Sequence, residues 1–216
     1  MSEVQQMPGD NYFAERHFIK TNPKTGVARN RSGTRMLSLT TDFLIGLRKA
    51  MIAECGPAAN LVFRSSGRKW GEMFAKRFDK EMSDFYQQPL KEMPMYFFEA
   101  CVLEAFSHHG WGSLRMDYTK YDKGIIVAEL QNALYSGLVE NPEEPSEALM
   151  TGILAGFFSY FAQQPLDAVQ THCETRGDSV SRFVISLATR MEEPIRLQEE
   201  GATSEAILAA LEKNVA

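Results

Sequence analysis

Cysteine and histidine are the side chains of this sequence best suited to nucleophilic catalysis or metal binding. The cysteines Cys55, Cys101 and Cys173 are widely spaced and odd in number, which is typical of a reducing compartment rather than a disulfide scaffold. A nucleophilic thiol needs a base beside it, but in a strand His172 and Cys173 point to opposite faces. Cys101 falls on the apolar face of a predicted helix, where cysteine usually packs as a small hydrophobe. Cys55 lies at a predicted helix end, which leaves its role less clear.

No sequence motif offers another route to catalysis. The chain contains no phosphate-binding loop, dinucleotide fingerprint, serine-nucleophile elbow or paired-histidine metal motif. His108 and His109 fall at the end of a predicted helix, where an imidazolium would interact with the terminal carbonyls, so a capping role is favoured over a ligand role. We therefore expect no catalytic residue and no metal site.

Length and composition indicate one globular domain with extensions. The chain has 216 residues, 44% of them hydrophobic, which is enough to fill a core. Its net charge of −5 at pH 7 argues against a general nucleic-acid-binding protein. The first ten residues, MSEVQQMPGD, have no apolar core, so we expect neither a signal peptide nor a membrane anchor, and a cytoplasmic location.

Residues 1–35 are predicted to form a flexible basic extension. They mix Gly, Pro, Asn, Lys and Arg with little periodicity, and NPKTGVARNRSGTR is the most linker-like stretch of the chain. A solvated tail is the favoured interpretation, and contact with an acidic partner or an anionic membrane surface is the alternative. The basic residues concerned are Lys20, Lys24, Arg29, Arg31 and Arg35.

The most apolar stretch predicts a buried helix. No charge occurs within 149–161, yet a bilayer span takes about 20 residues, so the run is too short to cross a membrane. Ser146 and Glu147 stand where a cap and a first-turn acid belong. Gly152 and Gly156 lie one turn apart on one face, which would let another backbone approach closely.

Two strand pairs surround this helix in the sequence. Further helices are predicted at 41–54, 58–83, 94–109 and from Ser204, which would be its cap. This order favours an α+β fold, with an antiparallel twisted sheet of about four strands covered by helices. The first hairpin joins 114–119 to 125–136 through a turn at 122–124, and the second joins 166–175 to 180–188 through a turn at 176–179.

Aromatic and methionine side chains are numerous enough to line an adaptable apolar pocket between helices and sheet, although a packed core is the default explanation. Within such a pocket, Tyr118, Tyr135 or Cys173 would orient the ligand. The residues predicted to line it are Trp70, Phe98, Cys101, Trp111, Tyr118, Tyr135, Phe157, Tyr160, Phe161 and Cys173.

Residues of the central helix and the second hairpin carry a family resemblance. They are Pro145, Gly152, Gly156, Cys173, Gly177 and Arg182-Phe183, with SSGRKWGEMFA at 65–75 as an upstream echo. In their order and spacing the chain resembles the 4-vinyl-reductase domain family, small-molecule-binding domains related in fold to subunits of a vesicle-tethering complex and to haem nitric-oxide-binding domains. The resemblance covers about residues 36–189, leaving 1–35 as the extension and 190–216 as a C-terminal helical segment.

The resemblance also allows a test for zinc. In some relatives, the aromatic-compound sensor domains of transcription activators, three cysteines and a glutamate hold a structural zinc. These positions fall on Glu147, Gln170, Cys173 and Ser181, where only Cys173 is retained. Because amide and hydroxyl groups are poor zinc ligands, we predict no zinc site of this type.

What the resemblance implies is binding of a hydrophobic or tetrapyrrole-type molecule, with links to chlorophyll biosynthesis and photosystem assembly. Our leading hypothesis is a non-enzymatic homodimer that binds such a ligand, works with a photosystem or pigment-enzyme partner, and contacts a photosynthetic membrane at its periphery. One alternative is a vinyl reductase of a chlorophyll precursor, which would need an external electron donor because no nicotinamide, flavin or iron-sulfur motif is present. Another is a ligand-free assembly scaffold.

Overall fold

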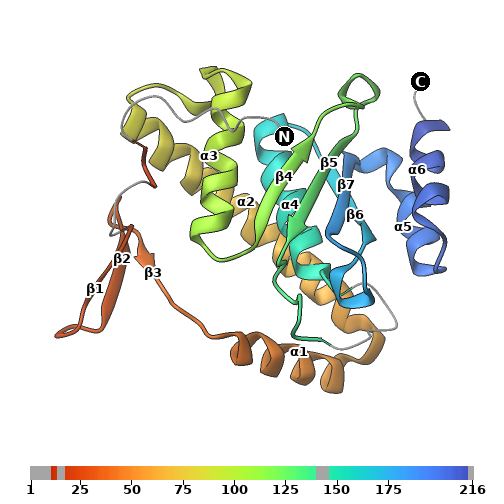
Figure 1. The fold of residues 1–216 in the computed structure, drawn as a ribbon, viewed down its shortest axis with the longest axis horizontal. Coiled ribbons are helices and arrows are strands. Elements are labelled where there is room, and N and C mark those ends of the chain that lie inside the picture. Colours follow the sequence, from red (N-terminus) through yellow and green to blue (C-terminus); the bar gives the residue numbers. More distant parts are fainter. Residues whose placement is uncertain (1–10, 14–17, 140–145, 214–216) are drawn as a thin grey trace.

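A computed structural model describes residues 11–13, 18–139 and 146–213 (Figure 1). The strands are β1 Ile19–Asn22, β2 Val27–Asn30, β3 Arg35–Met36, β4 Ser113–Asp117, β5 Ile126–Gln131, β6 Leu166–His172 and β7 Ser181–Leu187. The α-helices are α1 Thr41–Cys55, α2 Ala59–Tyr86, α3 Met95–His108, α4 Ala148–Ala162, α5 Glu192–Glu199 and α6 Ser204–Lys213.

The central sheet has the strand order β4-β5-β7-β6. Both predicted hairpins form, and β5 joins them by pairing antiparallel with β7. On β4, Leu114 and Met116 are buried whereas Ser113 and Arg115 are exposed, which is the alternation expected of a strand with one covered face. The prediction of an α+β fold with a four-stranded antiparallel sheet covered by helices is confirmed.

Helices α2 and α4 pack against each other through their glycines. A Cβ atom at Gly67 would lie 2.2 Å from the carbonyl oxygen of Leu149, and one at Gly152 would lie 2.1 Å from that of Arg64. Gly71 and Gly156 make equally close approaches one turn further along. Because any side chain would separate the two backbones, the predicted close packing at Gly152 and Gly156 is confirmed and its partner is identified as α2.

Helices cover both faces of the sheet. The larger core lies on the side of α2, α3 and α4, whereas α5 and α6 cover the other side (Figure 1). There, Val169 and Val184, which face each other in the β6–β7 register, pack with Met191, Ile207 and Leu211. The predicted C-terminal helix is confirmed, and it has this second core beneath it.

The N-terminal region differs from the prediction of a linker-like stretch. Residues 19–36 form a three-stranded antiparallel sheet, β1-β2-β3, and Tyr12, Phe13 and Phe18 are buried beside it. Glu81 of α2 anchors this sheet, because its carboxylate accepts hydrogen bonds from Asn30 Nδ2 at 3.0 Å and Thr34 Oγ1 at 2.5 Å. Glu81 lies 51 residues after Asn30 in the sequence. The local composition of the N-terminal region therefore does not reveal this contact.

Two predicted helix caps are wrong. The Ser146 hydroxyl hydrogen-bonds with Thr175 Oγ1 and Cys173 Sγ rather than with the backbone of α4. Ser204 donates to the carbonyl oxygen of Thr171, and Thr203 Oγ1 accepts from Ala206 N at 3.3 Å in its place. In both cases a tertiary partner competes successfully with the local cap.

Candidate functional site

Aromatic rings from α2, α3, α4 and the turn before β4 form a continuous cluster that runs from the exposed Trp70 into the larger core. Its path runs from Trp70 to Trp111 at 4.9 Å between ring centroids, on to Phe74 at 4.9 Å, and then to Phe157 at 5.6 Å. From Phe157 it continues to Phe161 at 5.0 Å and Phe98 at 4.8 Å. We call these six rings the aromatic cluster.

The structure brings together eight of the ten predicted pocket residues, in or around the aromatic cluster. Trp70, Trp111, Phe157, Phe161 and Phe98 belong to it. Cys101, Tyr118 and Tyr160 pack in the same core, and the Tyr160 hydroxyl donates to Asp79 Oδ2 at 2.8 Å. Tyr135 and Cys173 lie elsewhere, beside the start of α4. Ligand contact by any of the ten residues stays a prediction.

The titratable groups of this core favour their neutral forms. Burial raises the pKa of the Cys101 thiol to about 12, so Cys101 is a poor nucleophile. Burial also raises the pKa of Tyr118 well above its ordinary value. Neither the Cys101 thiol nor the Tyr118 hydroxyl is therefore suited to acid–base chemistry near neutral pH.

His109 also lies in this region, although the sequence predicted only a helix-capping role for it. The capping role is confirmed, because His109 Nδ1 donates to the carbonyl oxygen of Ala105 at 2.7 Å, and His108 Nδ1 lies 3.0 Å from that of Glu104. In addition, the His109 ring lies 4.7 Å from Trp111 and 5.7 Å from Phe74. Burial lowers its pKa, so the imidazole is neutral at pH 7 rather than the predicted imidazolium.

A buried carboxyl group stands at the start of α4. Glu147 is 1% exposed and its Oε1 accepts from the backbone N–H of Tyr135 at 2.7 Å, whereas its Oε2 has no partner among the described residues. Burial raises the pKa of Glu147 to about 7. The Tyr135 hydroxyl is likewise buried without a described partner. The bond between Glu147 Oε1 and the backbone N–H of Tyr135 ties the segment after β5 to α4.

Hydrogen bonds occupy the four positions that correspond to the relatives' zinc ligands. Gln170 Oε1 accepts from the backbone N–H of Glu147 at 3.2 Å, and Ser181 Oγ accepts from that of Glu174 at 3.2 Å. Cys173 Sγ lies 3.0 Å from Thr175 Oγ1. Amide and hydroxyl groups used in this way do not suit zinc. Among the described residues, no group of three or more His, Cys, Asp or Glu is placed to hold a metal ion.

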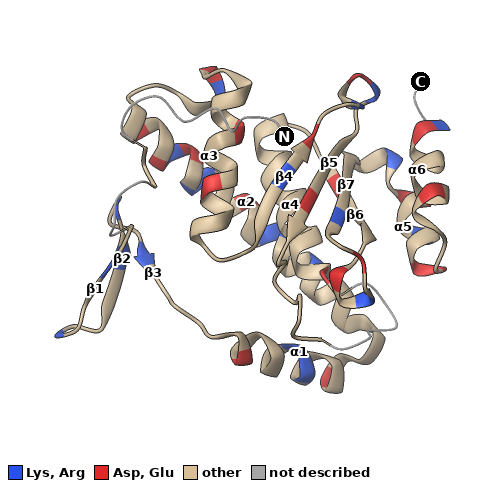
Figure 2. Ribbon diagram, viewed as in Figure 1, with Lys and Arg blue, Asp and Glu red and all other residues tan. Residues whose placement is uncertain are grey.

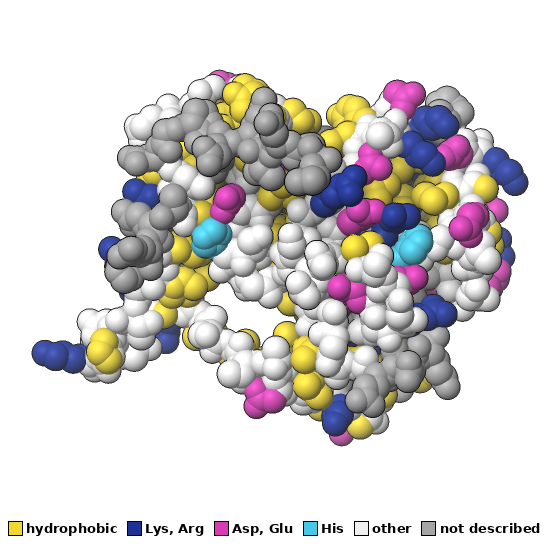
Figure 3. Space-filling view, in the orientation of Figure 1, with side chains coloured by type: hydrophobic (Ala, Val, Ile, Leu, Met, Phe, Trp, Pro, Cys, Tyr) yellow, Lys and Arg dark blue, Asp and Glu magenta, His cyan; other side chains and the backbone are white. Residues whose placement is uncertain are grey.

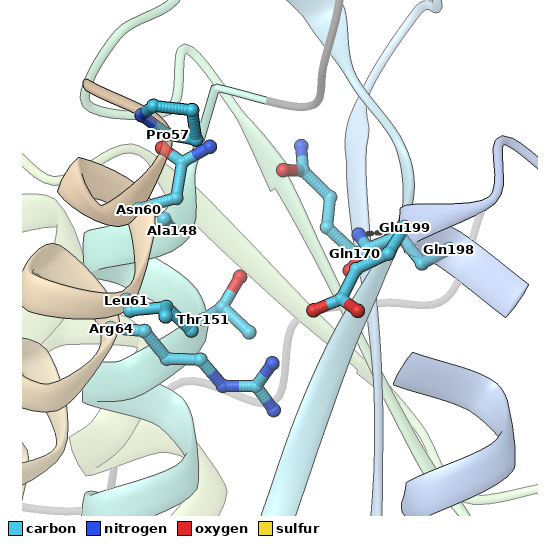
Figure 4. Close-up of a pocket in the computed structure, with 9 residues that line it drawn as sticks. All are labelled: Pro57, Asn60, Leu61, Arg64, Ala148, Thr151, Gln170, Gln198 and Glu199. Carbon is cyan, nitrogen blue, oxygen red and sulfur yellow. Dashed lines mark hydrogen bonds between the residues drawn. The ribbon is translucent and has the colours of Figure 1, made fainter. Parts of the chain in front are cut away.

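A cleft of about 250 Å³ lies outside the aromatic cluster. Figure 4 shows side chains from α2, the turn before it and α4 on one side and from β6 and α5 on the other. None of the ten predicted pocket residues lines it, because sequence reasoning concentrated on aromatic residues. Its lining residues are Pro57, Asn60, Leu61, Arg64, Ala148, Thr151, Gln170, Gln198 and Glu199.

Side chains beside the cleft protect the edge strand β6. Arg64 donates to the carbonyl oxygen of Ala168 at 2.8 Å, and Arg68 to that of Leu166 at 2.9 Å. Gln198 donates to the next outward carbonyl, that of Gln170, at 2.6 Å. Asp167 Oδ1 forms ion pairs with both arginines, at 2.7 and 2.8 Å. An exposed strand edge invites pairing with another chain, and here its outward carbonyls already have partners.

The fold and the aromatic cluster define an α+β domain with helices on both faces of an antiparallel sheet and an aromatic interior. The V4R domain family model matches residues 132–187, from the end of β5 through β7. Over that stretch, this match confirms the resemblance to the 4-vinyl-reductase domain family. Of the residues that carried the resemblance, Pro145 lies outside the described part. A comparison with curated proteins gave no match.

Solved structures resemble this chain at low sequence identity. The phenol-responsive sensory domain of the transcription activator PoxR, solved with phenol, is 17% identical with a TM-score of 0.64, covering 90% of this chain and 92% of that chain. A trafficking protein particle complex subunit 3 from Naegleria fowleri, covalently bound to palmitic acid, is 14% identical with a TM-score of 0.51, covering 68% and 94%. A vinyl-4-reductase family protein from Methanocaldococcus jannaschii is 17% identical with a TM-score of 0.49, covering 70% and 83%.

Within the described residues, no helix is both long and apolar enough to cross a membrane. This agrees with the prediction that the apolar run of α4 is a buried helix, and nine of its fifteen residues are buried.

Proposed function

We propose that this protein binds a small apolar or aromatic molecule among the rings of the aromatic cluster. The observation that carries the proposal is the unbroken series of ring contacts from Trp70 to Phe98, with centroid distances between 4.8 and 5.6 Å. Flat rings with polar edges provide a large contact area for an aromatic ligand at low entropic cost. The likeness of the fold to a phenol-bound sensory domain supports the same class of ligand.

His109 supplies a polar group for such a ligand. Its Nδ1 is the donor in the bond to Ala105, so Nε2 of the neutral ring is an acceptor. No hydrogen bond to Nε2 is formed within the described part of the chain. We propose that Nε2 accepts from a ligand hydroxyl, with the Trp111 ring packed alongside.

Dense packing favours one alternative, a ligand-free scaffold. Phe157 is fully buried, and the described cleft lies outside the aromatic cluster, so the rings must separate before a ligand enters. Binding therefore has to provide free energy for this opening. If no ligand can do so, the rings simply fill the core.

The finer hypotheses concern the ligand and its context. The proposal of a tetrapyrrole ligand, a photosystem or pigment-enzyme partner and contact with a photosynthetic membrane rests on the family resemblance. A tetrapyrrole macrocycle would require the rings to separate further than a phenol would. We also propose a homodimer through α1, which has no buried residue and exposes Phe43 and Leu47 at 48% and 39%. The ligand-binding domain is proposed to span residues 36–189.

Ligand retention and titration test this function. Native mass spectrometry of the purified protein would reveal any retained molecule and the number of subunits. Isothermal titration with phenol, palmitate and protoporphyrin would then separate the ligand classes. Saturable binding of one class that is weakened by His109→Phe or Phe157→Ala supports the proposal. Absence of binding to all three would favour the scaffold.

A further inference from the structure

Three cationic side chains form a row across the N-terminal sheet. In the β1–β2 register Lys20 lies directly opposite Arg29, and in the β2–β3 register Arg29 lies directly opposite Arg35. Directly opposed residues project from the same face, with strands about 4.8 Å apart. Lys20, Arg29 and Arg35 are all exposed, and we call them the cationic row.

The anchor of the sheet fixes which face is outward. Asn30 is only 6% exposed and donates to Glu81 of α2. Because neighbouring residues of a strand point to opposite faces, Arg29 points away from α2. The sheet therefore presents the cationic row to solvent, and Figure 2 shows β1–β3 carrying basic but no acidic residues.

Among the described residues, no carboxylate pairs with the cationic row. The sequence from 16 to 41 contains no Asp or Glu, and within the described residues no ion pair involves Lys20, Lys24, Arg29 or Arg35. The Arg29 guanidinium donates to the carbonyl oxygen of Gly33. Like charges directly opposite each other destabilise a sheet. The mutual repulsion of the three cations therefore destabilises the free protein, and an anionic surface would relieve that repulsion.

An exposed apolar side chain follows these charges in the sequence. Leu37, two residues after Arg35, is 76% exposed. Figure 3 shows dark blue side chains at the outer end of this sheet. The face of the row contains Asn22 and Val27 but no aromatic ring on which a nucleobase could stack. Cations beside an exposed leucine suit the interface of a bilayer, where headgroups attract the charges and the apolar side chain inserts.

We propose that the cationic row docks the protein on an anionic lipid surface, with Leu37 entering the headgroup region. The cationic row would provide the membrane contact that is part of the proposed function. This docking does not depend on which ligand occupies the aromatic cluster. Each cation near an anionic membrane strengthens binding about fivefold, which corresponds to about 1 kcal/mol. Three together account for about a hundredfold.

Vesicle co-sedimentation of the full chain tests this surface. The probe is phosphatidylcholine vesicles with phosphatidylserine at about 30 mol %, compared with phosphatidylcholine alone. The triple variant Lys20→Gln, Arg29→Gln, Arg35→Gln removes the charges and their mutual repulsion, so it is expected to fold. A matched control changes three exposed lysines elsewhere, Lys69, Lys91 and Lys213, to Gln.

We expect the wild type and the control to bind the acidic vesicles alike and the triple variant to bind about a hundredfold more weakly. Leu37→Ser should also weaken binding. The proposal is overturned if the wild type does not bind acidic vesicles, or if the triple variant binds as well as the control. Binding of the wild type to a DNA duplex but not to vesicles, or a changed subunit number in the triple variant, would assign the row to another partner and overturn it as well.

Discussion

Gly156 lies so close to Arg68 that a Cβ atom on the glycine would be 2.1 Å from the carbonyl oxygen of Arg68. No real Cβ tolerates that distance, so the spacing of α2 and α4 depends on hydrogen at this position. Because α2 and α4 carry Trp70, Phe74, Phe157 and Phe161, this spacing also positions much of the aromatic cluster.

Gly156→Ala is therefore expected to destabilise the protein by about 1–3 kcal/mol, since overpacking outweighs the gain in helix propensity. The matched control is Gly46→Ala in α1, where nothing lies within 4 Å, and this change should stabilise by up to about 1 kcal/mol. Urea unfolding of both variants measures the difference. Equal effects of the two substitutions would contradict close helix packing.

The pKa of Glu147 predicts a pH dependence of stability. Burial raises the pKa to about 7 from an ordinary 4.5, so the folded state keeps a proton that the unfolded chain releases. Its contribution is complete below about pH 4.5 and is lost as the pH rises through 7, by on the order of 3 kcal/mol. Unfolding free energies measured from pH 4 to 8 should decline less in Glu147→Gln than in wild type, whereas the exposed control Glu92→Gln should follow wild type.

Chelation is expected to leave the protein unchanged. Gln170 and Ser181 use their oxygens in hydrogen bonds to backbone N–H groups, so the fold at β6 and β7 does not need a metal. Elemental analysis should find far less than one zinc per chain, and EDTA should not alter Tm. One zinc per chain, with a fall in Tm on its removal, would show that the assignment of these positions is wrong.

Arg64→Ala is expected to destabilise the fold and to promote self-association through β6. The change removes bonds to Asp167 and to the carbonyl oxygen of Ala168, and it costs about 1–3 kcal/mol. It also exposes a strand edge that other chains can extend. Arg196→Ala, which breaks an exposed pair with Glu200, is the control and should cost less than about 1 kcal/mol. Urea unfolding and light scattering compare the two variants.

Much of the central fold follows from local sequence signals. Helices at 41–54, 58–83 and 94–109 and both hairpins were predictable because apolar periodicity and turn residues agree there. Residues 190–216 were predicted only as a helical segment with one helix from Ser204, and the structure adds α5, in which Pro194 occupies the first turn of Glu192–Glu199, where proline is tolerated. Helix α1 formed as predicted, but its apolar residues are not buried in this chain.

Contacts between distant residues explain what the sequence could not predict. The β1–β3 sheet depends on Glu81, and the role of His109 depends on its closeness to Trp111. Aromatic composition identified most rings of the aromatic cluster but not their order of contact. The cleft beside β6 escaped prediction because polar residues such as Asn60 and Gln198 converge on it from separate helices.

Tryptophan fluorescence tests the central claim most directly, because Trp70 and Trp111 are in contact at one end of the aromatic cluster. In a Trp70→Phe variant the remaining emission comes from Trp111, beside His109. Titration with phenol and with palmitate is predicted to change this emission saturably for one of them, with one molecule bound per chain, and His109→Phe should weaken the change. An emission that stays constant up to millimolar concentrations of both compounds would contradict ligand binding in the aromatic cluster.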